Sequence, residues 1–284
     1  MTGAYGCVRI VVAVKAERIL ILCKTYPSPS AGYAETSCVA GITDSGEMRR
    51  LFPVPFRLIE DEQQFRKWQW IYTKLEKARK DHRPESHTIF IDTIECDPVV
   101  ISTDNNWRDR RRWIQQIPTF ETFAAAERAR QERGITLALV RPSRVTALDI
   151  TPVDNPEWTE DEKAKLTQDQ MQAQLFEPSK NIRLLRKLPF DFHYRYECKS
   201  LDGVSSYRHK IVDWEAGALF WNVRSRHRAK WQEPFREKLE LELPRRELLF
   251  LMGTLHRFPD QWLIVSLIYP PKQPAESTHQ ASLF

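Results

Sequence analysis

Residues 36–56, TSCVAGITDSGEMRRLFPVPF, contain two apolar runs separated by a short polar segment. The segment Thr43–Gly46 between the runs has a composition typical of a β-turn, so this stretch predicts a hairpin. An earlier pair of runs, VRIVVAVK and RILILCK, flanks Ala16 and Glu17 and predicts another hairpin. Four short strands with tight turns and one long connecting loop predict a small N-terminal β-barrel.

The remaining sequence predicts a helical middle and a second α+β region. Residues 105–133 have helical character interrupted at Pro118, with Thr119 as a helix N-cap and Gly134 as the C-terminal glycine. Residues 189–198 alternate between aromatic and polar side chains, as in a strand with one buried face. We therefore expect a β-rich domain with a helical insertion at 1–150, a polar linker or bridging helix at 151–180, a basic α+β domain at 181–271 and a disordered tail at 272–284.

Composition and motifs exclude several classes of protein. The five cysteines form no C-x-x-C pair, which is typical of a reducing compartment. No apolar run approaches the length of a membrane span, so we expect a cytoplasmic protein with no membrane partner. The sequence also lacks the phosphate-binding, dinucleotide-binding and nucleophile-elbow glycine motifs.

Positive charge is concentrated in one segment. The whole chain carries a net charge of +5, whereas residues 183–231 hold eleven Lys or Arg against five Asp or Glu, a net +6. Within WNVRSRHRAKW, basic side chains lie between Trp221 and Trp231, and cations next to aromatic rings suit nucleic acid. The candidate contacts are Arg195, Arg224, Arg226, Arg228, Lys230 and Trp231. The alternative is a solvated helix face with no ligand.

The stretch HKIVDWE, residues 209–215, offers a candidate catalytic site. Asp213 and Glu215, with Lys210 nearby, could hold a divalent metal ion in a nuclease. Asp213 also stands where a strand ends and a helix begins, so it is a natural N-cap, and Glu215 suits the first helical turn. We favour the capping role and expect no cofactor outside the nuclease alternative.

The stretch ETSCVAGITDSGEMRRLFPV resembles bacterial dual-OB nucleic-acid-binding modules over residues 18–57. In that family the pattern C-x-A-G is followed by a glycine and a run that resembles Trp-Ile-Arg; here Met48 replaces the Trp. The matching positions are Cys38, Ala40, Gly41, Gly46 and Arg49 or Arg50. The resemblance implies an OB-like barrel that binds nucleic acid on one face, with Arg49 and Arg50 among the contacts. An ordinary β-hairpin is the alternative.

The final residues, QASLF, resemble the pentapeptide by which bacterial replication and repair proteins bind the DNA sliding clamp. The matching residues are Gln280, Ser282, Leu283 and Phe284, while Ala281 replaces the commoner Leu. The resemblance implies an extended tail whose Leu and Phe enter an apolar pocket of the clamp. A similar run occurs at residues 172–176. The alternative is a terminus that folds back on its own protein.

Together these features predict an α+β protein with an OB-like barrel, a helical middle and a C-terminal mixed antiparallel sheet with two helices. The predicted function is that of a nucleic-acid-binding accessory protein in bacterial DNA repair, replication or phage defence. We expect no catalysis. The alternatives are a metal-dependent nuclease and a non-catalytic interaction subunit of a defence complex, whose basic segment would contact a partner protein.

Overall fold

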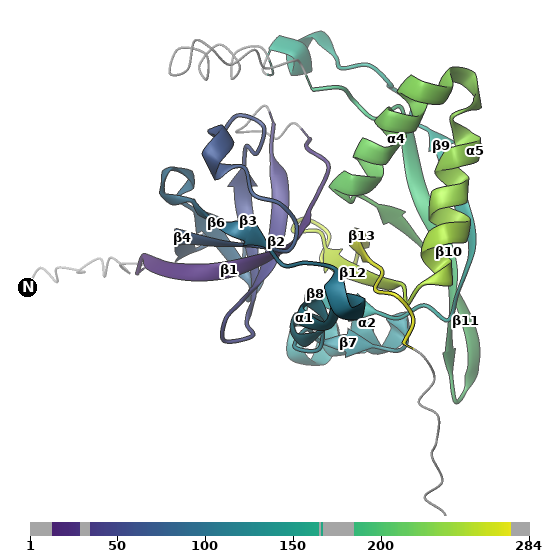
Figure 1. The fold of residues 1–284 in the computed structure, drawn as a ribbon, viewed down its shortest axis with the longest axis horizontal. Helices are drawn as coiled ribbons and strands as arrows, with labels where there is room; N and C mark the ends of the chain where they lie inside the picture. Colours follow the sequence, from purple (N-terminus) through teal and green to yellow (C-terminus); the bar gives the residue numbers. More distant parts are fainter. Residues whose placement is uncertain (1–12, 29–34, 165, 167–184, 274–284) are drawn as a thin grey trace, which may run out of the picture.

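A computed structural model describes residues 13–28, 35–164, 166 and 185–273, which form two lobes (Figure 1). Each lobe is built on one β-sheet, the first containing β1–β6 and the second β7–β13. The helix α1 (Asp104–Ile114) connects the two sheets in sequence. Within these described residues, no helix combines the length and apolar character needed to cross a membrane.

The strands of the first lobe close into a five-stranded barrel. The order is β1-β2-β3-β5-β4, and β4 pairs with β1 to complete the ring, while β6 pairs with β4 as well. Neighbouring strands are antiparallel except for the parallel pair β3 and β5. The bounds are β1 Lys15–Lys24, β2 Ser37–Thr43, β3 Met48–Val54, β4 Gln69–Lys77, β5 Ser86–Ile89 and β6 Glu95–Val100, with short 3-10 turns η1 (Asp61–Gln63) and η2 (Ile91–Thr93). The predicted small barrel is confirmed.

Strand β1 explains why the barrel and the second lobe are one packed unit. Its alternate residues Ile19 and Ile21 lie in the barrel core, whereas Leu20 and Leu22 pack into a cluster shared with the second sheet. Successive side chains of a strand point to opposite faces, so a strand buried on both faces must be apolar throughout. The run ILIL satisfies this requirement.

The hairpin predicted around Ala16 and Glu17 is wrong. Both residues lie within β1, a continuous strand of 10 residues, and pair with Lys74 and Thr73 of β4. Neither Ala nor Glu supplies the positive φ or the local side-chain hydrogen bond that favours a tight turn. Residues 1–12, which include most of the first predicted run, lie outside the described chain.

The second sheet is mixed and has the order β7-β8-β12-β13-β11-β10-β9. The pairs β7–β8 and β11–β13 are parallel, and the others are antiparallel. The bounds are β7 Thr119–Phe120, β8 Leu137–Val140, β9 Arg144–Pro152, β10 Phe190–Ser200, β11 Gly203–Ile211, β12 Leu249–Thr254 and β13 Trp262–Ile268. The C-terminal sheet is therefore present, and it is larger than the sequence predicted.

Helices cover one face of this sheet. They are α2 (Phe123–Arg133), α4 (Trp214–His227) and α5 (Gln232–Arg236), followed by the π-helical turn η4 (Glu237–Glu242); η3 (Arg228–Lys230) and η5 (Leu243–Arg245) are 3-10 turns. Phe192 of β10 packs against Phe220 of α4 and Phe235 of α5. The hydroxyl of Tyr194 donates to the carbonyl of Leu239 at 2.6 Å. The alternation predicted for residues 189–198 thus corresponds to one aromatic face under the helices.

The sheets divide the chain between residues 100 and 119, and not at the predicted boundary of 150. Strands β7, β8 and β9, which we expected in the first domain, belong to the second sheet. Strand β8 pairs with β12, more than a hundred residues later, and no local sequence signal reveals such a pairing. Thr119 lies in β7, so the N-cap of α2 is Thr122, whose side chain accepts from the amide of Ala125; Gly134 ends the helix as predicted.

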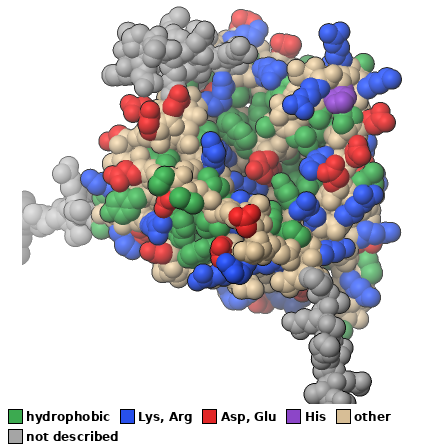
Figure 2. Space-filling view, in the orientation of Figure 1, with side chains coloured by type: hydrophobic (Ala, Val, Ile, Leu, Met, Phe, Trp, Pro, Cys, Tyr) green, Lys and Arg blue, Asp and Glu red, His purple; other side chains and the backbone are tan. Residues whose placement is uncertain are grey.

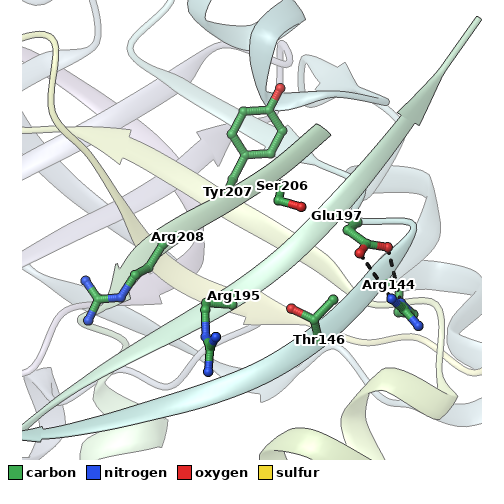
Figure 3. A pocket seen from close by; sticks show the side chains of 7 residues that line it. All are labelled: Arg144, Thr146, Arg195, Glu197, Ser206, Tyr207 and Arg208. Atoms are coloured by element: carbon green, nitrogen blue, oxygen red, sulfur yellow. Dashed lines mark hydrogen bonds and ion pairs between the residues drawn. The ribbon is translucent and has the colours of Figure 1, made fainter. Parts of the chain in front are cut away.

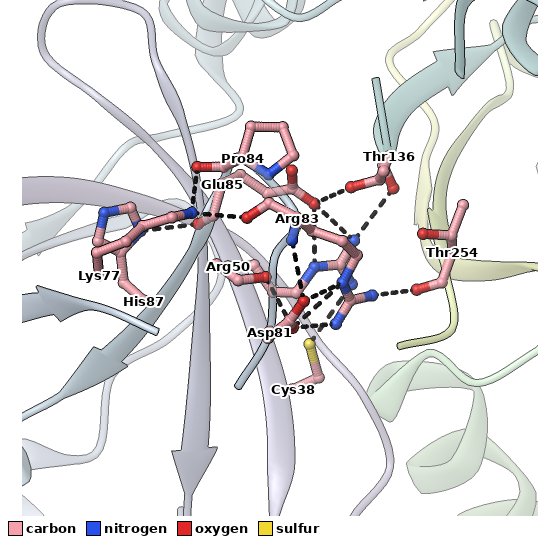
Figure 4. A network of polar contacts seen from close by, with 11 residues as sticks. Cys38, Arg50, Lys77, Asp81, Arg83, Pro84, Glu85, His87, Thr136 and Thr254 are labelled. Carbon is pink, nitrogen blue, oxygen red and sulfur yellow. Dashed lines mark hydrogen bonds and ion pairs between the residues drawn. The ribbon is translucent and has the colours of Figure 1, made fainter. Parts of the chain in front are cut away.

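A buried polar network joins the lobes beside the shared apolar cluster (Figure 4). Arg50 of β3 donates to Glu85 at 3.0 Å and to the carbonyl of Thr136 in the second lobe at 3.1 Å. The hydroxyl of Thr136 also donates to Glu85, and Arg83 donates to the carbonyl of Thr254. Because these groups satisfy one another out of water, they fix the orientation of the barrel on the second sheet.

Candidate nucleic-acid interface

The far end of α4 carries a cluster of cations, which we call the α4 cluster. Its members are Arg224, Arg226, Arg228 and Lys230, and all four are exposed. Within the described residues none of them forms an ion pair with a carboxylate. Figure 2 shows Lys and Arg side chains gathered at the upper right, over this end of α4 and its junction with α5. The cluster therefore presents uncompensated positive charge to solvent.

Local helix physics accounts for part of this arrangement. Arg224 and Arg226 lie in the last turn of α4, where cations interact favourably with the helix dipole. Arg228 has a φ of 49°, and the helix stops there. The only hydrogen bond from a guanidinium of the cluster within the described chain joins Arg224 Nη1 to the carbonyl of Arg228 at 3.5 Å. These effects position the cations without neutralising them.

The cation predicted at Arg195 lies elsewhere, on the outer face of strands β9–β11 (Figure 3). There Arg195 and Arg208 donate to the same carboxylate, Asp149, at 2.9 and 2.8 Å. The hydrogen bond from Arg208, followed by the charge of Arg195, holds the pKa of Asp149 below its usual range. Each guanidinium on this face thus has a carboxylate partner.

Two further cations of this β9–β11 face are paired as well. Arg144 contacts Glu197 at 3.1 Å, and Lys210 contacts Asp191 at 2.6 Å. The face forms a shallow concavity, lined by Arg144, Thr146, Arg195, Glu197, Ser206, Tyr207 and Arg208. In Figure 3 the guanidinium groups of Arg195 and Arg208 extend from neighbouring strands. Its mixed charges make it a weaker phosphate-binding surface than the α4 cluster.

Three of the predicted contacts are buried. Arg50 is 3% exposed and belongs to the network between the lobes, and Arg49 is 9% exposed and donates to Glu17 at 2.6 Å. Trp231 is 3% exposed and packs against Phe220. The structure therefore corrects the expectation that these side chains face a ligand, because a buried group offers no surface to a nucleic acid.

A further exposed group adjoins α4. The guanidinium carbon of Arg186 lies 3.9 Å from the centroid of the Trp221 ring. The indole N–H of Trp221 donates to the hydroxyl of Tyr26 at 2.9 Å, and that hydroxyl donates to the carbonyl of Arg186 at 2.8 Å. The sequence places Trp221 beside the α4 cluster and includes Arg186 in the same basic segment, but it gives no sign that Tyr26 joins them. Burial raises the pKa of Tyr26, so its hydroxyl remains a donor at neutral pH.

Asp213 caps α4, as the favoured alternative predicted. Its carboxylate accepts from the amides of Glu215 at 2.6 Å and Leu267 at 2.7 Å, and it is 4% exposed. Burial raises the pKa of Asp213, while Lys67 and the two amides oppose that shift. Asp213 therefore ties the start of α4 to β13.

The other members of the nuclease alternative have separate partners. Glu215 accepts from Lys67 at 3.0 Å, and Lys210 is paired with Asp191 on the outer sheet face. The described residues contain no group of three or more His, Cys, Asp or Glu placed to hold a metal ion. The geometry therefore supports a structural role for this stretch.

The clamp-like tail, Gln280–Phe284, and the similar run at residues 172–176 lie outside the described residues, as does half of the predicted linker. In the described part of the linker, Thr159 and Glu162 form a capping box: the amide of Thr159 donates to Glu162 and the amide of Glu162 donates to the hydroxyl of Thr159. The expectations about the tail remain predictions.

Two family models match the chain, and the border between them coincides with the border between the two sheets. Residues 15–116 match a family described as Domain of unknown function (DUF8758). Residues 115–284, more than half of the chain, match Domain of unknown function (DUF8757). The chain belongs to the DUF8757 family. The border between the matches falls at the end of α1, between the barrel and the first strand of the second sheet. No curated protein matches the chain.

Proposed function

We propose that this protein is a nucleic-acid-binding accessory protein that acts in the bacterial cytoplasm in DNA repair, replication or phage defence. The observation that carries the proposal is the α4 cluster, where four exposed cations have no carboxylate partner in the described chain. Uncompensated cations gain from binding phosphates because they release condensed counterions, whereas cations already paired must first give up a carboxylate. The surface fits a polyanion better than it fits a neutral ligand.

We also propose that the barrel is OB-like. Its support is the five-stranded ring in the order β1-β2-β3-β5-β4, closed by β1 and β4. OB-folds bind ligands with strands 2 and 3 and the loops after strands 1 and 4. Here Arg50 of β3 and Glu85 of the β4–β5 loop contact Thr136 of the second lobe. We therefore assign the barrel a scaffold role and the ligand contact to α4.

The test compares two variants that lose the same charge. R224Q/R226Q/R228Q neutralises three of the four cations of the α4 cluster, and R144Q/R195Q/R208Q neutralises three cations of the β9–β11 face. Binding of fluorescent oligonucleotides should fall roughly 10-fold or more at low salt for the first variant, and the slope of log K against log salt should decrease by about 2 to 3. The second variant should bind almost like the parent protein. Equal losses in both variants, or none in either, would contradict the assignment.

The C-terminal tail supports recruitment to DNA through the sliding clamp. Gln280, Ser282, Leu283 and Phe284 match the clamp-binding pattern, and the preceding residues are polar. A short extended peptide of this kind gains its affinity from apolar side chains that enter a pocket. Titration of a purified bacterial clamp with the full chain should give micromolar binding that is lost when residues 280–284 are removed. Retained binding by the truncated chain would place recruitment elsewhere.

A further inference from the structure

We infer that the ligand is a single-stranded nucleic acid, with its phosphates on the α4 cluster and one base stacked on the outer face of the Arg186 guanidinium. This inference rests on the proposed function and names the class of nucleic acid. Its basis is the stack formed by Arg186 and Trp221, which lies on the same helix as the cluster.

Hydrogen bonds and an aromatic contact fix the positions of Arg186 and Trp221. Trp221 donates to Tyr26, Tyr26 donates to the backbone of Arg186, and Phe220 contacts the edge of the Trp221 ring with centroids 4.8 Å apart. One turn earlier on α4, Gly217 leaves no room for a Cβ, because such an atom would overlap the ring of Tyr26. Tyr26 therefore lies directly against the helix. A platform fixed in this way loses little conformational entropy when a ligand binds.

The guanidinium of Arg186 is the part of this stack that a ligand can reach. Arg186 is exposed, whereas Trp221 is partly covered, and no ion pair of Arg186 occurs among the described residues. A planar guanidinium resting on an indole presents a second flat face, and nucleic-acid bases stack on such faces. The structure thus offers a stacking surface that carries a positive charge.

The stack of Arg186 and Trp221 lies beside the first cation of the α4 cluster. Arg224 follows Trp221 by three residues, and residues at this spacing are neighbours on a helix surface. The exposed Ser225 follows at four residues. On the helix axis, roughly one turn of about 5 Å therefore separates Trp221, which supports the stack, from Arg224, the first cation of the cluster. A base on Arg186 and the adjoining phosphates on the cluster can be bound at the same time.

This combination favours a single strand over a duplex. In a duplex both faces of each internal base are covered by neighbouring base pairs, so a flat guanidinium beside the helix finds only phosphates and groove edges. A single strand presents free base faces, and proteins that bind such strands combine a basic track with stacking surfaces. The inferred ligand is therefore single-stranded DNA or RNA.

The experiment measures binding of the full chain to an oligonucleotide of about 15 nucleotides, as DNA, as RNA and as the DNA duplex. The variant R186K keeps the charge but loses the flat stacking face. We expect it to reduce single-strand affinity roughly 10-fold, leave duplex affinity within twofold and leave the salt slope unchanged. The fluorescence of a 2-aminopurine base in the single strand should change when the parent protein binds and change less when R186K binds.

The matched control is R133K. Arg133 is exposed on α2 and its guanidinium carbon lies 5.9 Å from the Phe120 ring, so it is also a surface cation on an aromatic side chain. R133K should bind like the parent protein, and thermal unfolding of both variants confirms that they are folded. Equal affinity of R186K and the parent for single strands would overturn the stacking assignment, while loss on R224Q/R226Q/R228Q would still support the proposed function. If the parent binds no oligonucleotide, both proposals fail.

Discussion

The β9–β11 face and the α4 cluster differ in ion pairing: four cations of the first share carboxylates, whereas the four cations of the second have none in the described chain. On the β9–β11 face, Arg144, Arg195, Arg208 and Lys210 share three carboxylates, which leaves a net charge of +1. The four cations of the α4 cluster have no carboxylate partner in the described chain, and their net charge is +4. The number of basic residues in a segment is thus a poor guide to its electrostatic potential. Ion pairing with carboxylates decides the potential of the surface.

The largest expected effect on stability comes from the replacement of Arg50, a cation that is both paired and buried. R50A removes the partner of Glu85 and the donor to Thr136, both inside the contact between the lobes. We expect the free energy of unfolding to fall by about 3–5 kcal/mol, because Glu85 becomes an unpaired buried charge. R226A, at an exposed unpaired cation, should change it by less than about 0.5 kcal/mol. Urea unfolding of both variants tests the contrast, and similar losses would contradict it.

Lys24 is a third kind of cation, mostly buried and without an ion pair among the described residues; its ammonium donates to the carbonyl of Phe65 at 3.0 Å. Its ammonium lies 3.4 Å from the centroid of Phe56 and 5.1 Å from that of Trp214, and burial lowers its pKa to about 8. Because the unfolded chain binds more protons between pH 8 and 10.5, this lysine makes stability rise with pH across that window. The contribution is at most about 3 kcal/mol.

Replacement of Lys24 by Met should remove this pH dependence. The difference in unfolding free energy between the parent and K24M should change in favour of the parent as pH rises from 7 to 10. Urea unfolding at several pH values measures this difference, in which the other titrating groups cancel. A difference that stays constant across the window would show that Lys24 keeps an ordinary pKa in the folded protein.

Removal of a carboxylate should make the β9–β11 face resemble the α4 cluster. D149N leaves Arg195 and Arg208 without their common partner. Two newly free cations should raise oligonucleotide affinity at low salt by about 3- to 10-fold and steepen the salt slope by about 1. Fluorescence anisotropy at several salt concentrations measures both. Unchanged binding would show that ion pairing with Asp149 is not the reason why this face binds nucleic acid weakly.

The converse change, which adds a carboxylate, should slightly weaken oligonucleotide binding by the α4 cluster. Asn222 is exposed and lies four residues before Arg226 on α4, so N222E supplies a carboxylate at the favourable helical spacing. We expect oligonucleotide affinity to fall by about 2- to 5-fold, since one cation becomes paired and a negative charge is added. N222Q, which keeps the size of the side chain, should bind like the parent, and an equal loss in N222Q would assign the effect to shape.

Prediction from sequence succeeded where the interactions are local. The aromatic alternation of β10, the Asp213 cap, the Gly134 stop and the cluster at the end of α4 depend on residues within a few positions of each other. It failed to place β7–β9 in the second sheet, because the sheet neighbours of these strands come from later in the chain. It also failed for Arg49, Arg50 and Trp231, because residue type does not reveal burial.

Local sequence is enough to predict the hairpin of β2 and β3, the concentration of charge in residues 183–231 and the helix that carries Arg224 and Arg226. Which cations are free depends on the folded arrangement of the chain. Arg195 meets Asp149 across 46 residues and Arg50 meets Thr136 across 86, whereas the α4 cluster meets no carboxylate in the described chain. Charge pairing depends on distances of a few ångströms in space, and those distances arise only when the two sheets have folded.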